Sequence, residues 1–342
     1  MRFNFSIITV LLAAALLTGS GGSAHAQKSK GQGRGQGQGI GRGEGKGQGE
    51  DKKQQTQSEA VIAATATVNI TLSTGSGKIS VRGWDKQEVR ARAKDKDATV
   101  EANVVGGRDE ATPAARVEIL VSDKSEEDNA CSANSDLLLD VPRGATLNLK
   151  TQDGDIEVDD VTEVHIETSG GRVDLRRISK ATEAASVGND ITLEDSGGRA
   201  RLNTLGGVIQ VRNIRLLDAG DFLKIKTVSG DILLDRIGPA RVEADTISGG
   251  IEMAGPLARG GSYTFTTTTG DVTLDLPADS SFKINARVSE GGEIVTDFPL
   301  KYKGSTSPAS LLHAGRIQAT YGSGDSTINL VSFSGTLQLR KK

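Results

Sequence analysis

The chain repeats a short pattern in which apolar and polar residues alternate, turn at a glycine or asparagine, and continue as apolar-x-apolar. From residue 156 to residue 272 the first apolar position after the turn advances in steps of 17, 18, 18, 23, 19 and 21 residues. A fixed unit of about 20 residues is typical of a solenoid. The copies are Gly77-Lys-Ile79-Ser-Val81, Gly154-Asp-Ile156-Glu-Val158, Gly171-Arg-Val173-Asp-Leu175, Asn189-Asp-Ile191-Thr-Leu193, Gly207-Val-Ile209-Gln-Val211, Gly230-Asp-Ile232-Leu-Leu234, Gly249-Gly-Ile251-Glu-Met253 and Gly270-Asp-Val272-Thr-Leu274.

Each unit predicts two short strands that meet at the glycine corner. Val164-His-Ile166-Glu-Thr168 and Leu223-Lys-Ile225-Lys-Thr227, which stand before a corner, alternate with the period of a half-buried strand. Aspartate or asparagine beside the glycine favours a tight turn. We therefore predict an all-β fold, a single-stranded parallel β-helix-like solenoid with coils of roughly 20 residues. A stacked β-hairpin sandwich or prism has the same periodicity and stays open as the alternative.

The repeats divide the body of the chain, residues 61–342, into three parts. Residues 143–274 hold the regular repeats, and residues 275–342 hold C-terminal repeats and a cap. Residues 61–142 contain one clear repeat and predict an N-terminal cap, because the end of a solenoid must hide its exposed ladder. The charged stretch 104–136 within this cap predicts a mobile insertion.

Two segments precede the body. Residues 1–26 have the features of a cleaved signal peptide: a positive Arg2, an apolar core over residues 7–17, and the small-x-small site Ala24-His25-Ala26. No later apolar run approaches the roughly 20 residues that span a bilayer, so the mature chain predicts no transmembrane segment. Residues 27–60, rich in glycine and glutamine, predict a disordered linker. The protein is therefore expected in the periplasm or outside the cell.

Composition narrows the class of protein. The 342 residues include 43 glycines but only 7 Phe, 3 Tyr and 1 Trp, which argues against a compact helical enzyme. One cysteine, Cys131, excludes an internal disulfide framework and a multi-cysteine zinc site. Lysine and arginine exceed aspartate and glutamate by 7 − 3 = 4 over residues 27–58, whereas over residues 59–342 the balance is 33 − 41 = −8. The chain is a weakly basic linker followed by an acidic body.

The corner aspartates are the one candidate metal site. In a coil they would line one edge, where facing carboxylates suit Ca²⁺, although aspartate is also simply a good turn residue. Arg172, Val208 and Gly250 interrupt the row. The four residues are Asp155, Asp190, Asp231 and Asp271.

No catalytic residues are predicted. His165 alternates with apolar neighbours and is expected to face outward between Glu163 and Glu167. The densest acidic run, residues 153–160, predicts a solvated face, and no aromatic platform for a sugar is evident. No other cofactor is implied.

The order of several motifs resembles the bacterial putative-adhesin family of β-strand-repeat domains of unknown function. The resemblance covers residues 64–340 and implies an extracytoplasmic β-repeat protein without an established enzymatic activity. It is carried by Gly83-Trp84-Asp85, Val141-Pro142-Arg-Gly144, the serial Ser-Gly-Asp/Gly-Ile/Val units, Leu276-Pro277-Ala-Asp279, Gly322-Ser-Gly-Asp325 and Ser334-Gly335.

We therefore predict an exported, non-catalytic cell-surface or envelope module that presents an extended β face for binding. Its partner would be an envelope polymer, a polysaccharide or a surface protein, and no specific nucleic-acid binding is expected. A polysaccharide lyase or hydrolase built on a β-helix, and a purely structural spacer, are the alternatives.

Overall fold

The computed structural model describes residues 59–342 except 96, 107–111, 124–134, 290 and 304–314. This described part contains 26 strands and no helix. The predicted signal peptide, linker residues 27–58 and Cys131 lie outside it. Strand β1 already begins at Glu59, so the predicted linker boundary at residue 60 is two residues too late.

The strands before each glycine corner form one ladder, called sheet B here. Neighbouring strands in it are parallel except β4–β5, β21–β24 and β23–β24, which are antiparallel. Its spatial order is β4 (Ala98–Val104), β5 (Ala114–Asp123), β1 (Glu59–Thr74), β7 (Thr146–Thr151), β9 (Glu163–Thr168), β11 (Ala181–Ser186), β13 (Arg199–Thr204), β15 (Phe222–Lys226), β17 (Arg241–Asp245), β19 (Ser262–Thr269), β25 (Ser326–Ser334), β21 (Phe282–Val288), β24 (Arg316–Tyr321) and β23 (Lys301–Tyr302).

The strands after each corner form a second ladder, sheet A. The first residues of β1 also pair in this ladder, which joins all the strands into one hydrogen-bonded network. Here β1–β3 and β3–β6 are antiparallel and all other neighbours are parallel. The order from β1 onward is β3 (Glu88–Ala93), β6 (Leu137–Pro142), β2 (Ile79–Trp84), β8 (Ile156–Asp159), β10 (Val173–Arg176), β12 (Ile191–Glu194), β14 (Ile209–Ile214), β16 (Ile232–Ile237), β18 (Ile251–Ala254), β20 (Val272–Leu276), β26 (Thr336–Lys341) and β22 (Glu293–Thr296).

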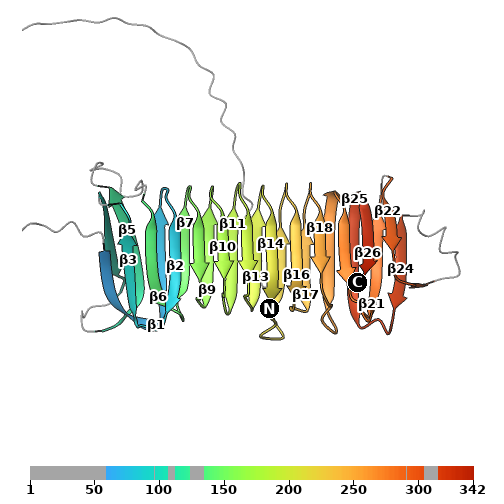
Figure 1. Ribbon diagram of the computed structural model, residues 1–342, viewed down its shortest axis with the longest axis horizontal. Coiled ribbons are helices and arrows are strands. Elements are labelled where there is room, and N and C mark those ends of the chain that lie inside the picture. The colour runs from blue at the N-terminus through green and yellow to red at the C-terminus, as the bar shows by residue number, and fades with distance from the viewer. Residues whose placement is uncertain (1–58, 96, 107–111, 124–134, 290, 304–314) are drawn as a thin grey trace, which may run out of the picture. The chain divides into compact units, whose positions relative to one another are not determined.

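One strand of each sheet makes one coil, and successive coils stack in register, with Ile156 opposite Val173 and Val173 opposite Ile191 (Figure 1). The predicted β-solenoid is confirmed. The hairpin alternative is wrong for the regular repeats, because their two strands lie in different parallel ladders and do not pair with each other.

The core lies between the two sheets and consists of apolar rows. In sheet A, the first apolar residue of every coil from Ile79 to Val272 is fully buried, as the period-two pattern requires. Valine, isoleucine, leucine and alanine fill most of these rows, as a narrow interior predicts. Three aromatic side chains, Tyr263, Phe265 and Phe282, are also fully buried, all toward the C-terminal coils.

Both ends of the solenoid depart from chain order. The coil β1–β2 lies between β5–β6 and β7–β8, and the coil β25–β26 lies between β19–β20 and β21–β22 (Figure 1). The first and last strands of the body are thus each covered by another coil. This arrangement protects the terminal strands from fraying and leaves internal segments to cap the ladders.

The prediction that residues 104–136 form a mobile insertion is wrong for residues 114–123. Residues 114–123 form β5, and Val117, Ile119 and Val121 are buried in the core. Arg116 and Glu118, which suggested a solvated loop, occupy the outward positions of this strand. The many charged residues of this segment obscured the alternation of apolar and polar residues that buries one side of β5 in the core.

The corner at the end of the sheet A strands is built from left-handed residues that are not glycine. Their φ angles lie between 50° and 62°, a region that costs most L residues about 1–2 kcal/mol. In one stacked pair of this row the side-chain amide of Asn213 donates to Asp195 Oδ1. The row is Asp160, Arg177, Asp195, Asn213 and Arg236.

Candidate binding surface

A row of buried threonine and serine side chains lines the inner side of the glycine corner. The Thr204 hydroxyl donates to the Gly206 carbonyl at 2.6 Å, and the Thr267 hydroxyl donates to the Gly249 carbonyl at 3.1 Å. These bonds satisfy carbonyl groups that the tight corner turns inward. The row is Thr74, Thr151, Thr168, Ser186, Thr204, Thr227, Thr246, Thr267 and Ser332.

The corner aspartates occupy every second coil. In each case Oδ1 accepts a hydrogen bond from the backbone N–H of the corner residue one coil further on, such as Arg172 for Asp155, at 2.6–3.0 Å. The residues that interrupt the row in sequence are therefore its hydrogen-bond donors. The full row is Asp136, Asp155, Asp190, Asp231 and Asp271, which accept from Lys78, Arg172, Val208, Gly250 and Thr336.

This geometry gives the aspartates a role in joining coils. Strands in a sheet are about 4.8 Å apart, so aspartates in alternate coils are separated by about 9.6 Å. Within the described residues, no three His, Cys, Asp or Glu side chains gather as a metal-ligand set. Calcium binding by Asp155, Asp190, Asp231 and Asp271 stays a prediction, which calorimetric titration with calcium chloride tests.

At Asp136, the contribution of a charged carboxylate in this row to stability can be tested by changing the pH. Its pKa is lowered, first by the hydrogen bond from the Lys78 N–H and then by Lys94, whose Nζ lies 3.2 Å from Oδ2. A lowered folded-state pKa stabilises the fold above the unfolded value of 3.8, and this contribution is lost as pH falls through the folded-state pKa. We expect Asp136→Asn to be less stable than wild type at pH 6, and the difference to shrink below about pH 4.

Urea unfolding of both proteins between pH 3 and 6 measures this difference. High salt should reduce it, because the Asp136 side chain is 43% exposed. A difference that is independent of pH would show that the charge has no role.

The acidic run of residues 153–160 is ion-paired along the outer face. Glu157 pairs with Lys78 at 2.5 Å, Asp159 pairs with Arg177, and Asp160 pairs with Arg143 at 3.1 Å. Carboxylates that are held by cations on neighbouring coils are less suited to act as an acid and base pair on a glycosidic bond. The predicted solvated acidic face is therefore cross-linked between coils.

Large apolar side chains line the outer side of the glycine corner. They lie in consecutive coils, apart from the coil that carries Thr268, and are between 41% and 54% exposed. Their backbones stack in register, since the Ser229 N–H donates to the Leu205 carbonyl at 2.9 Å. Exposed apolar rows of this kind are unusual on a soluble surface. The residues of this corner stripe are Val187, Leu205, Val228, Ile247 and Phe333.

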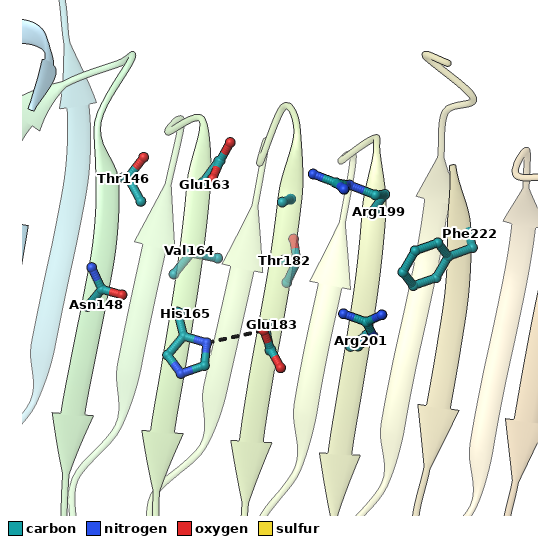
Figure 2. Close-up of a pocket in the computed structure, with 11 residues that line it drawn as sticks. Thr146, Asn148, Glu163, Val164, His165, Thr182, Glu183, Arg199, Arg201 and Phe222 are labelled. Atoms are coloured by element: carbon teal, nitrogen blue, oxygen red, sulfur yellow. Dashed lines mark ion pairs between the residues drawn. The ribbon is translucent and has the colours of Figure 1, made fainter. Parts of the chain in front are cut away.

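The outer face of sheet B contains an open depression of about 430 Å³ across β7 to β15 (Figure 2). Its acidic side lies on β9 and β11. His165 faces outward as predicted, with Nδ1 3.4 Å from Glu183 and Nε2 3.6 Å from Glu167. The pKa of Glu167 is lowered, mainly by the hydrogen bond from Lys150. Glu163 pairs with Lys180 at 2.5 Å, so each acidic group on this side already has a partner.

The other side of the depression is cationic and contains an aromatic ring. Figure 2 shows Phe222 of β15 turned toward β13, which carries Arg199 and Arg201. The Arg201 guanidinium lies 4.9 Å from the centre of the Phe222 ring, within the range of a cation–π contact. Arg241 of β17 is directly opposite Phe222 in the ladder. The expectation that no aromatic platform exists is wrong, because Phe222 is partly exposed on this face.

Sequence reasoning missed this group because its members are 42 residues apart and come from three repeats. Phe222 precedes Leu223-Lys-Ile225, so the alternation itself placed it on the outer face. Arg199 and Arg241 each occupy the same position before their own apolar residue. Aligning the repeats by this position would have brought the three residues into one row.

The described residues contain no helix with the length and hydrophobicity needed to cross a membrane. No curated protein matches the chain.

Three solved structures resemble this chain at low similarity. A putative adhesin from Parabacteroides merdae is 9% identical, with 82% of this chain and 95% of that chain covered and a TM-score of 0.43. A putative adhesin from Bacteroides fragilis is 12% identical, with 83% and 96% covered and a TM-score of 0.38. A putative cell adhesion protein from Clostridium sporogenes is 11% identical, with 83% and 99% covered and a TM-score of 0.23.

The family model described as Toastrack DUF4097 matches residues 58–340. This range includes nearly every described strand and agrees with the range 64–340 over which the motifs show their resemblance. The chain therefore belongs to the Toastrack DUF4097 family of β-strand-repeat domains of unknown function.

Proposed function

We propose that the protein is an exported, non-catalytic adhesion module that binds its partner through the outer face of sheet B. The observation that carries this proposal is the depression on that face, where a partly exposed Phe222 lies among three arginines. Aromatic and arginine side chains are the types most enriched at the energetic centres of binding surfaces. Residues 1–26 would direct export as a cleaved signal peptide.

The alternatives have less support from the described residues. A glycoside hydrolase needs two carboxyl groups free to act on either side of a glycosidic bond, whereas in the depression Glu163 pairs with Lys180 at 2.5 Å and Glu183 lies 3.4 Å from His165. A pure spacer gives no reason for three arginines that take part in no ion pair between described residues.

A blocking label on one face tests the proposal. Ala181 on β11 lines the depression, and Ala254 on β18 faces outward on sheet A with a similar partial exposure. Each is replaced by cysteine in a Cys131→Ser background and coupled to a polyethylene glycol maleimide. Co-sedimentation of residues 27–342 with washed envelopes of the source cell then measures binding.

We expect the label at position 181 to abolish envelope binding and the label at position 254 to leave it within about twofold of the unlabelled protein. Equal binding by both labelled proteins would show that the outer face of sheet B is not the binding surface. Binding that persists with the label at position 181 and is lost in high salt would assign the interaction to the basic residues 27–58.

A further inference from the structure

We propose that the Arg199–Phe222–Arg241 row is a binding site for an anionic glycan, a polysaccharide that carries carboxylate or sulfate groups. This inference rests on the proposed function and names the class of ligand for the same face. It extends the sequence-based expectation of an unspecified envelope polymer, polysaccharide or surface protein.

The register of the strands makes the row linear. Phe222 is opposite Arg241 in the β15–β17 pair, and the pairing of Ala200 with Leu223 brings Arg199 beside Phe222 on the other side. Arg199 and Arg241 are two strands apart, about 9.6 Å. Two arginine side chains on strands at this spacing, with a ring on the strand between them, can contact one extended polymer that crosses the strands.

The charge of the row is not compensated. On the same face Lys224 pairs with Glu243 at 2.7 Å, and Lys226 pairs with Asp245 at 3.5 Å. The pKa of Glu243 is lowered, mainly by the hydrogen bond from Lys224, so this carboxylate is already satisfied. No ion pair between described residues involves Arg199, Arg201 or Arg241. The charges of Arg199 and Arg241 therefore remain available on a body whose formal net charge is 33 − 41 = −8, whereas Arg201 is opposite Glu183 in the ladder.

The chemistry of the row suits a charged sugar. Guanidinium groups bind carboxylate and sulfate oxygens through paired, charge-assisted hydrogen bonds. The face of an aromatic ring offers an apolar surface on which the C–H face of a pyranose can pack. The acidic side of the same depression adds Thr146, Asn148 and carboxylate oxygens, which can bond sugar hydroxyls.

The same surface disfavours a nucleic acid. Single strands are bound by several stacked aromatic rings along a basic groove, whereas this depression contains one phenyl ring, Phe222 on β15, and the imidazole of His165 three strands away on β9. An anionic glycan also offers hydroxyl groups that Thr146, Asn148 and the carboxylates can bond, so it fits both sides of the depression.

Isothermal titration calorimetry of residues 27–342 tests the site with four probes. Polygalacturonate carries carboxylates, dextran sulfate carries sulfates, dextran is neutral, and oligo(dT) carries phosphates. We expect binding to polygalacturonate, dextran sulfate or both, and none to dextran. The arms distinguish carboxylate from sulfate as the group that is recognised.

The variants Phe222→Ala and Arg199→Ala/Arg241→Ala measure how much of the glycan affinity comes from the row rather than from the rest of the chain. Each should weaken glycan binding about ten- to hundredfold. The matched control Lys283→Ala/Arg287→Ala removes two outward charges from β21 on the same sheet and should change binding less than about twofold. Thermal unfolding of each variant tests whether the fold is retained.

The row is refuted as an anionic-glycan site if all variants bind like wild type, since residues 27–58 would then account for the affinity. Equal affinity for dextran, or tighter binding of oligo(dT) that depends on Phe222, would also overturn it. Envelope binding that is still blocked by the label at position 181 would preserve the proposed function in each of these cases. Envelope binding unaffected by that label would instead refute the proposed function.

Discussion

Replacing Gly207 by alanine is expected to destabilise the protein by about 2–5 kcal/mol. Gly207 has φ = 107°, which an L residue resists. A Cβ atom built on it would lie 2.5 Å from the backbone carbon of Asn189 and 2.7 Å from its oxygen in the preceding coil. Because backbone atoms of two stacked coils are involved, neither can move without breaking ladder bonds. A lower urea midpoint in equilibrium unfolding measures the loss.

The adjacent glycine is the matched control. A Cβ atom on Gly206 would have its nearest neighbour, the Ser229 oxygen, at 3.8 Å. Gly206→Ala should therefore change stability by less than about 1 kcal/mol, since alanine also restricts the unfolded chain. Similar losses for both variants would show that the close stacking of the corner glycines does not determine stability.

Phe265→Ala is expected to cost about 3–5 kcal/mol. Phe265 is fully buried and lies opposite Ala244 in one neighbouring coil and Leu330 in the other. Because the opposite residue Ala244 is small and the ladders fix both strands, truncation of the buried ring opens a cavity that the neighbouring coils cannot close. Thermal and urea unfolding measure the effect.

Two further variants define the cause. Phe265→Leu should cost less than about 2 kcal/mol, because leucine already occupies this row at Leu330. Phe333→Ala removes the same side chain from the corner stripe, where it is 52% exposed, and should change stability by less than about 1 kcal/mol. A large loss at Phe333 would mean that the stripe is covered in solution.

The repeating part of the fold is readable from sequence because stacking in register repeats the same local environment. The residue one coil further on from Ile156 is Val173, and each coil must bury that position. The period-two pattern, the corner glycines and the outward direction of His165 follow from this rule. The same rule predicted that four of the five corner aspartates lie along one edge of the solenoid.

Where the sequence failed, the missing information was which coil lies beside which. Asp136 belongs to the aspartate row, but its coil β5–β6 stacks on β1–β2, whose corner residue Lys78 is 58 positions away. Read along the chain, Arg172, Val208 and Gly250 broke the row, whereas in space they donate to it. Strand β5 was taken for part of an insertion because of its charged residues, and the sequence did not show that it pairs with the distant β1.

The sequence by itself therefore determined the class of fold, the coil length and the faces of the regular strands, because these depend on local alternation and on glycine at the corners. Only the tertiary structure decided the order of the terminal coils, the alternating aspartate bonds and the row that joins Arg199, Phe222 and Arg241. Parallel ladders pair residues that are one coil apart or more, and all coils share one period. The pattern of one coil consequently does not specify which coil stacks beside it. The packing of the whole stack decides that order.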